Sequence, residues 1–265
     1  MRHPPTDVVG HRVQVGRRDR ADERGIRHGL SVRRGIRAAV HGTVDPQKTS
    51  NLDRDDGCPG VGRTCEDRTV LDTTTARLEL RSLTLDDVDE LYAVYSDPET
   101  WRHLPEGRFT SRERARRLIE RSLRSVRATG LGEWAVRVGA GGAAAGLAAG
   151  TFIGAGGVKL SAGGVWNLGY RLTPVSWGRG FATEVARAAL EGAAWAAPDV
   201  PVTARVLANN PASVRVIERV GLELVWEGHP PASGALQNGE EPPLRRVYTD
   251  RPLSPDAYRW LVRHA

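Results

Sequence analysis

Three small residues mark a point in the chain where an alternating segment gives way to a long apolar one. They are Gly178, Gly180 and Ala182. Small residues let a ligand approach the backbone, and the unpaired N–H groups of a helix's first turn point at such a ligand. The helix dipole adds a positive potential at the same end. The pattern therefore favours binding of a phosphate or pyrophosphate group.

Other chemistries find weaker support in the sequence. No Gly-x-Gly-x-x-Gly follows a strand pattern and no Gly-Lys-Ser/Thr occurs, which argues against a dinucleotide site or a P-loop. The glycines within 154–157 lie inside a strand pattern and indicate a β-bulge. Cys58 and Cys65 are separated by six residues and have no second cysteine pair, so no metal site is expected. No nucleophile-elbow motif is present, which argues against Ser/His/Asp chemistry.

Alternating and amphipathic segments predict the elements that must position these residues. Strands are predicted over 77–81, 134–138, 151–159, 165–172, 201–206, 222–226 and 245–249. Helices are predicted from Thr84 to Asp97-Pro98, from a capping box at Thr110–Glu113 to Gly130, over 181–197 and 212–220, and onward from Ser254-Pro255. The Gly/Ala-rich residues 139–150 are expected to form a flexible hairpin connection. Mixed strands and helices in this order predict one α+β (mixed α/β) domain over 76–265.

Several ordered motifs resemble those of one enzyme superfamily. The segment Trp177 to Glu184, Trp-Gly-Arg-Gly-Phe-Ala-Thr-Glu, resembles the acyl-CoA motif Gln/Arg-x-x-Gly-x-Gly/Ala of GNAT-superfamily N-acetyltransferases. Trp177 replaces the first Gln/Arg, as in the branch resembling ribosomal-protein-alanine N-acetyltransferases. Asn210-Pro211-Ala212-Ser213 and the following residues 214–222 are similar to that branch's second signature. Motifs at 80–83, 96–99 and 168–172 extend the resemblance over about residues 77–226.

The resemblance implies a fold and a cofactor site. The fold would be GNAT-like, with a central, mostly antiparallel twisted sheet in which two parallel strands, ending near Leu172 and Val206, splay apart. Acetyl-CoA would enter the gap as co-substrate, with the N–H of Leu172 near its thioester carbonyl and Asn210 in the same site. The backbone N–H groups that would hold its pyrophosphate are those of Gly178, Arg179, Gly180, Ala182 and Thr183.

The resemblance also implies an activity. A primary amine, either a protein N-terminus or a small amine, would attack the thioester directly. Ser213 is the expected general acid, since Ile217 stands where many relatives carry a tyrosine; capping of the helix after Asn210 is an equally open role for Ser213.

The general base is left open by the sequence. Asn167 stands where relatives often carry an acid, and an amide cannot take a proton. The base would be a water chain or one of Glu133, Glu240 and Glu241. The alternative that Asn167 motivates is a non-catalytic acyl-CoA-binding or interaction module.

The charge of the chain is distributed unevenly. Its 38 basic and 32 acidic residues give +6, and residues 1–70 hold 14 of the former and 10 of the latter, or +4. That segment contains none of the 15 aromatic residues, so it is expected to be disordered, because it cannot bury enough apolar area to offset its ordering entropy. Only two of the basic residues are lysine, which indicates GC-rich coding, and a native start near Val70 is expected.

The partners and location follow from the remaining residues. They carry only +2, which argues against a nucleic-acid partner. The chain has no apolar run long enough to span a membrane. The two cysteines provide no disulfide framework, so we expect a cytoplasmic protein, as a monomer or homodimer.

Overall fold

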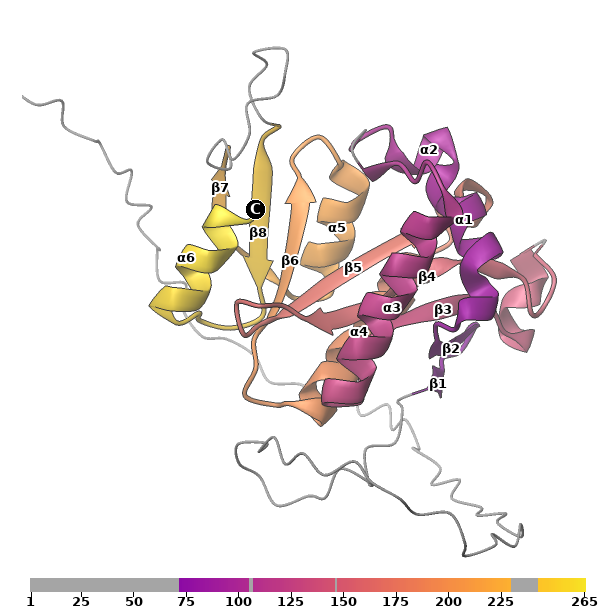
Figure 1. Ribbon diagram of the computed structural model, residues 1–265, viewed down its shortest axis with the longest axis horizontal. Helices are drawn as coiled ribbons and strands as arrows, with labels where there is room; N and C mark the ends of the chain where they lie inside the picture. Colours follow the sequence, from indigo (N-terminus) through magenta and orange to yellow (C-terminus); the bar gives the residue numbers. More distant parts are fainter. Residues whose placement is uncertain (1–71, 105–106, 146, 230–242) are drawn as a thin grey trace, which may run out of the picture. The chain divides into compact units, whose positions relative to one another are not determined.

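The computed structural model describes residues 72–104, 107–145, 147–229 and 243–265. Its strands form an eight-stranded sheet in the order β1-β2-β3-β4-β5-β6-β8-β7 (Figure 1). Every neighbouring pair is antiparallel except β5 and β6. The predicted mixed α/β fold with one parallel pair is confirmed. The strands are β1 (Thr73–Thr74), β2 (Leu78–Ser82), β3 (Glu133–Val138), β4 (Phe152–Leu160), β5 (Trp166–Leu172), β6 (Val202–Leu207), β7 (Glu223–Gly228) and β8 (Arg245–Thr249).

Helices cover both faces of the sheet. One face, here called the α4 face, packs on α4 and α5 through a core that includes Trp134, Trp166 and Phe181. The opposite face packs on α1 and α3 over β3 and β4, and on α6 over β8; we call it the α6 face. The α-helices are α1 (Val88–Ser96), α2 (Pro98–Trp101), α3 (Arg112–Thr129), α4 (Phe181–Ala196), α5 (Pro211–Arg219) and α6 (Pro255–Arg263), and the 3₁₀ helices are η2 (Leu85–Asp87), η4 (Ala140–Ala145) and η5 (Pro174–Ser176).

The parallel pair separates before its strands end. β5 and β6 pair only from Trp166↔Val202 to Leu168↔Ala204, although β5 continues to Leu172 and β6 to Leu207. Figure 1 shows the two strands diverging towards their carboxyl ends, with α5 seen in the opening. The last residues of both strands therefore border a gap in the sheet.

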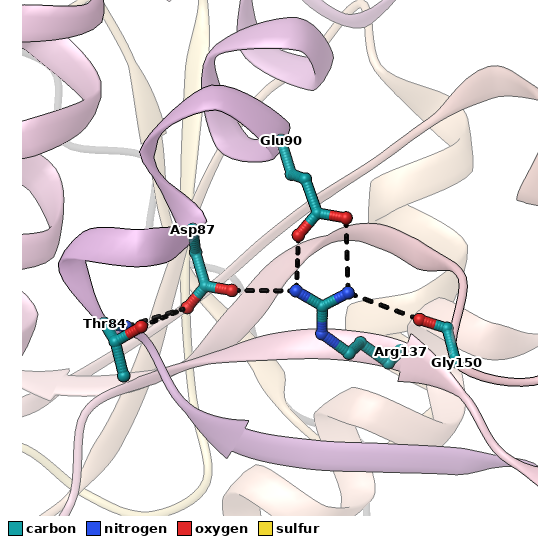
Figure 2. Close-up of polar contacts among 5 residues, drawn as sticks. All are labelled: Thr84, Asp87, Glu90, Arg137 and Gly150. Atoms are coloured by element: carbon teal, nitrogen blue, oxygen red, sulfur yellow. Dashed lines mark hydrogen bonds and ion pairs between the residues drawn. The ribbon is translucent and has the colours of Figure 1, made fainter.

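An ion-pair network fastens α1 to the sheet on the α6 face. Arg137 of β3 donates from Nη2 to Oδ1 of Asp87 at 2.9 Å and also pairs with Glu90 (Figure 2). The second oxygen of Asp87 accepts from the backbone N–H of Thr84 at 2.8 Å, which completes a capping box. Glu90 and Asp87 raise the pKa of Arg137 through these hydrogen bonds. The start of the helical region is thus tied to the middle of the sheet.

The expected helix stop at Asp97-Pro98 is confirmed, because α1 ends at Ser96 with Asp97 as its C-cap. The same two residues also start α2, which was not predicted: the Asp97 side chain accepts from the N–H of Glu99, and proline suits a first helical position.

Two local predictions need correction. The capping box at Thr110–Glu113 is wrong: α3 has Ser111 as its N-cap, without a side-chain hydrogen bond. Residues 139–150 contain η4. The register shift opposite Val136/Arg137 places a bulge at Ile153, beside the glycines expected to form one.

Some predictions fall outside the described residues: those on the 1–70 segment, Cys58, Cys65, Val70, Glu240 and Glu241. Within the part that is described, no helix is long and apolar enough to cross a bilayer. In the same ranges, no group of three or more His, Cys, Asp or Glu side chains could hold a metal ion.

Candidate active site

A pocket of about 590 Å³ opens where β5 and β6 separate. It is lined by the ends of both strands, the turn after β5, the first turn of α4, one side of α5 and five residues between 99 and 104, namely Glu99, Thr100, Arg102, His103 and Leu104. Seven of the eight predicted site residues line it, and Arg179 does not. The seven are Leu172, Gly178, Gly180, Ala182, Thr183, Asn210 and Ser213.

The turn between β5 and α4 presents its backbone to this pocket. Gly178 and Gly180 have φ angles of +73° and +79°, a conformation that favours glycine. No side chain of the described residues caps α4, and its first backbone bond runs from the N–H of Glu184 to the carbonyl of Gly180, at 3.1 Å. The preceding N–H groups lack an intrahelical acceptor, so they are suited to an anion. They belong to Phe181, Ala182 and Thr183.

The segment entering β2 holds this turn in place. Arg77 forms an ion pair with Glu184 of α4, 2.7 Å from Nη2 to Oε2, and its backbone N–H donates to Oε1 at 2.9 Å. The hydroxyl of Thr75 donates to the same carboxylate. Nη1 of Arg77 donates to the carbonyl of Arg179 at 2.8 Å. The helix start and the glycine turn are therefore fixed to the residues between β1 and β2, which are distant in the sequence.

The edge of β5 offers unpaired backbone groups to the gap. Thr173 donates its N–H to Ile153 of β4 at 2.8 Å, and residues of an antiparallel strand alternate in the neighbour they face. Tyr170 and Leu172 therefore direct their backbone groups away from β4, into the gap beyond the last residue paired with β6. The carbonyl oxygen of Leu172 accepts a hydrogen bond from Nε1 of Trp177, at 2.8 Å. The N–H of Leu172 and both groups of Tyr170 face the pocket.

At the start of α5, Asn210 and Ser213 have different contacts. The Asn210 side chain is the N-cap and accepts from the backbone N–H of Ser213 at 3.1 Å. The Ser213 carbonyl accepts from the hydroxyl of Tyr170 at 3.3 Å, and burial raises the pKa of that tyrosine to about 12. The capping role considered for Ser213 thus belongs to Asn210. The Ser213 side chain borders the pocket, and its hydrogen bond with Tyr170 partly offsets the effect of burial on the pKa of that tyrosine.

On the α6 face, Glu133 and Asn167 lie near the point where the strands separate. The Asn167 Oδ1 accepts from Nε of Arg205 at 3.1 Å. Glu133 is 7% exposed; its Oε1 accepts from Lys159 at 3.2 Å, and its buried Oε2 has no partner among the described residues. A Cβ on Gly169 would lie 3.9 Å from the Glu133 Oε1. Gly169 lines the pocket, so the Glu133 carboxylate lies just behind the pocket wall.

Comparison with known families decides what this site belongs to. Residues 77–223 match the family model described as an acetyltransferase (GNAT) domain. The chain belongs to the GNAT acetyltransferase family. The matched range covers more than half of the chain and includes the seven predicted residues that line the pocket and Arg179, and it identifies the protein as an N-acetyltransferase.

Solved acetyltransferase structures share the fold. The chain is 21% identical to an acetyltransferase from Agrobacterium tumefaciens str. C58, over 74% of this chain and 100% of that one, with a TM-score of 0.53. For a GNAT acetyltransferase from Bacillus anthracis the identity is 19%, over 68% and 96%, with a TM-score of 0.50. The microcin C7 self-immunity acetyltransferase MccE, solved with acetyl-CoA and AMP, is 15% identical over 65% and 91%, also at 0.50. No curated protein matches the sequence.

Several arginines of this GNAT pocket were not predicted from the sequence. Arg215 and Arg219 stand one turn apart on α5, a spacing that could have been read as one helix face. Arg205 and Arg245 come from β6 and β8, which are neighbours in the sheet but far apart in sequence. Burial lowers the pKa of Arg205, and the positive charge of Arg245 lowers it further.

Proposed function

We propose that this GNAT acetyltransferase transfers the acetyl group of acetyl-CoA to a primary amine, either a protein N-terminus or a small amine. The observation that carries the proposal is the pocket at the split between β5 and β6, bordered by an uncapped helix start. The family membership and the acetyl-CoA complex of MccE support it.

The residues at the α4 start suit a coenzyme A pyrophosphate. A Cβ on Gly178 would meet nothing within 4 Å, so that side of the turn is open to a ligand. The N–H groups of Gly178, Arg179, Gly180, Ala182 and Thr183 would hold the phosphates, and the dipole of the 16-residue α4 would favour their charge. Asn210 has its side-chain oxygen committed to the cap, which leaves its NH₂ group as the donor to the cofactor.

When bound, acetyl-CoA supplies the acetyl group as a thioester. The gap-facing N–H groups of Tyr170 and Leu172 would polarise the thioester carbonyl and stabilise the charge that develops on it. A neutral amine attacks that carbonyl, the new C–N bond forms and the C–S bond breaks. Ser213 would donate its hydroxyl proton to the departing thiolate, whose pKa is about 8.5.

A base must remove a proton from the ammonium form of the acceptor before attack, because only the neutral amine has an electron pair for the new C–N bond. Asn167 cannot do so, and its oxygen is bonded to Arg205. Of the three carboxylates considered, Glu133 lies among the described residues, directly behind Gly169. We infer that Glu133 accepts the proton through a water at Gly169. This route combines the water and the carboxylate that the sequence left open as alternative bases.

The CoA site is tested by two glycine-to-glutamate substitutions. Both introduce a negative charge at a residue with a positive φ angle, so they impose the same kind of backbone strain. Gly180→Glu would place a carboxylate at the proposed phosphate site and should weaken CoA binding by about 100-fold or more, because like charges face each other. Gly164→Glu is the control: Gly164 has φ +68°, no neighbour within 4 Å of an added Cβ, and no part in the pocket lining. Calorimetric titration with CoA measures the dissociation constant of each variant.

Turnover is measured by thiol release with acetyl-CoA and a panel of amines. Acetylated product from at least one amine is the expected result. CoA binding without turnover on any amine would favour the non-catalytic acyl-CoA-binding module instead. Equal CoA affinity in the two glycine variants would refute the proposed phosphate site.

A further inference from the structure

The pocket carries an imbalance of charge. Among its described lining residues, six are arginine and a single one, Glu99, is acidic. Glu99 is itself paired with Arg102, at 3.0 Å. The other five arginines therefore have no acidic partner among the described residues that line the pocket.

Two of these arginines lie together on the α6 face. In the β6–β8 register Leu207 faces Arg245 and Arg205 faces Val247. Because alternate residues share a face, Arg205 and Arg245 both point to the side on which Val247 packs against α6. Burial lowers the pKa of Arg205, and the positive charge of Arg245 on the same face lowers it further.

Neither guanidinium has a carboxylate partner within the described ranges. Arg205 donates to the side chain of Asn167 and to the carbonyl of His264, both neutral acceptors. The Nε of Arg245 is buried and makes no hydrogen bond to any described residue. Two adjacent cations with an unused, buried donor are costly unless an anion joins them.

Their position separates them from the proposed coenzyme site. The pairing of β5 with β6 ends at Leu168 and Ala204. Arg205 follows Ala204 and stands opposite Gly169, at the apex of the gap, where the two strands begin to separate. Gly169 has no side chain to obstruct that face. The glycine turn lies beyond the far end of β5, and Arg215 and Arg219 belong to α5 on the α4 face. Arg205 and Arg245 therefore border the apex of the gap on the α6 face of the sheet.

We propose that Arg205 and Arg245 bind a carboxylate of the acceptor, so that the amine acetylated by this protein belongs to a molecule that also carries an acid group. The inference rests on the proposed function and restricts the class of acceptor amine. The planar guanidinium presents paired N–H donors that match a carboxylate. A polyamine would bring further positive charge to two uncompensated cations, so it is the class that this pocket disfavours.

Binding tests the inference without requiring turnover. The probes are ω-amino acids of two to six carbons and the dipeptide Ala-Glu, each compared with its neutral amide (Ala-Gln for the dipeptide), and 1,4-diaminobutane. They are titrated calorimetrically into the full chain in the presence of CoA. At least one acid should bind about ten-fold or more tightly than its amide, the difference expected for a charge-assisted hydrogen bond. The two arms show whether the acid is that of a free amino acid or of a peptide.

The variants assign that preference to the arginine pair. Arg245→Gln should reduce the acid-to-amide ratio to within about two-fold, whereas Arg245→Lys should retain part of it. Arg246→Gln is the matched control: Arg246 is the next residue of β8, its side chain points to the other face, and it pairs with Glu227 outside the pocket. Its ratio should be unchanged.

Each outcome bears on one claim. Acids that bind no better than their amides, a stronger preference for the diamine, or an acid preference that survives Arg245→Gln would overturn the inference. Thiol release on the same probes is measured separately. Acid-selective binding with no turnover on any probe would leave the arginine site standing and count against the proposed acetyl transfer.

Discussion

At the residue scale, the start of α5 divides two roles between neighbouring polar side chains. Asn210 caps the helix, whereas the Ser213 side chain borders the pocket and is hydrogen-bonded to Tyr170. Tyr170 is bonded to the Ser213 carbonyl and stays protonated far above neutral pH, since burial raises its pKa to about 12. Stability and proton donation can therefore be tested separately at two residues of one turn.

Ser213→Ala should lower kcat by about 100-fold at a stability cost of about 1 kcal/mol or less, because it removes one hydrogen bond, with Tyr170, at the edge of the pocket. Asn210→Ala is the complementary variant: it should cost about 1 kcal/mol of stability through loss of the cap. Thiol-release kinetics across pH and thermal unfolding measure the two effects. An unaltered kcat in Ser213→Ala at every pH would remove Ser213 from the mechanism.

At the element scale, the start of α4 is positioned by the turn between β1 and β2 rather than by a cap. Glu184 accepts from Thr75, the Arg77 backbone and the Arg77 guanidinium, and its side chain is 15% exposed. Arg77 also lies over the ring of Phe181, 4.8 Å from its centroid. The same arginine thus holds the glycine turn, the first helical residue and the first helical turn.

Glu184→Ala should destabilise the protein by about 2 kcal/mol, because it leaves several half-buried donors without their acceptor. CoA affinity should fall as well, since the turn that holds the phosphates loses its anchor. Glu191→Ala, on the exposed side of the same helix, is the control and should change neither quantity. Denaturant unfolding and CoA titration give both values; equal stabilities of the two variants would contradict the anchoring role.

The junction between α1 and the sheet gives a second test at this scale. Asp87 is 7% exposed and bridges Arg137 to the Thr84 cap (Figure 2). Asp87→Ala should therefore cost about 2 kcal/mol of stability. Asp86→Ala, one residue earlier and exposed, should cost little. A similar loss in both variants, measured by urea unfolding, would show that the network contributes nothing specific.

The sequence predicted most elements to within one or two residues, because alternation and helical spacing are local signals. The α2 helix was missed because Asp97-Pro98 can end one helix and begin another, and the two-residue β1 is too short to leave a pattern. The glycine turn was visible as a motif. The Arg205–Arg245 pair was not, because it depends on the register between two strands separated by α5 and β7.

At the scale of the whole molecule, the net charge beyond residue 70 is small, but positive charge is concentrated in the pocket. Residues beyond 70 carry +2, yet the described pocket lining holds six arginines and one glutamate. A cleft lined by one sign of charge focuses the field where an anionic ligand enters. We infer that the positive charge serves the coenzyme phosphates on one face of the sheet and the acceptor acid on the other.

The chain from Asp72 onward should contain all that the active site requires. The Asp72 carboxylate accepts from the N–H of Ser82 at 2.7 Å, and β1 pairs with β2 just after it, so a cut before Asp72 preserves both contacts. A chain of residues 72–265 should match the full-length protein in melting temperature and in CoA affinity to within about two-fold.

A cut six residues later provides the contrast. A chain of residues 78–265 loses Thr75 and Arg77, and with them the acceptor contacts of Glu184 and the hold on the Arg179 carbonyl. It should be less stable by about 2 kcal/mol or more and bind CoA more weakly, since the glycine turn is no longer fixed. Calorimetry on the two truncated chains and the full chain measures both quantities. A loss of affinity already in 72–265 would place a required element before Asp72, whereas unchanged affinity in 78–265 would show that the turn is held without Arg77.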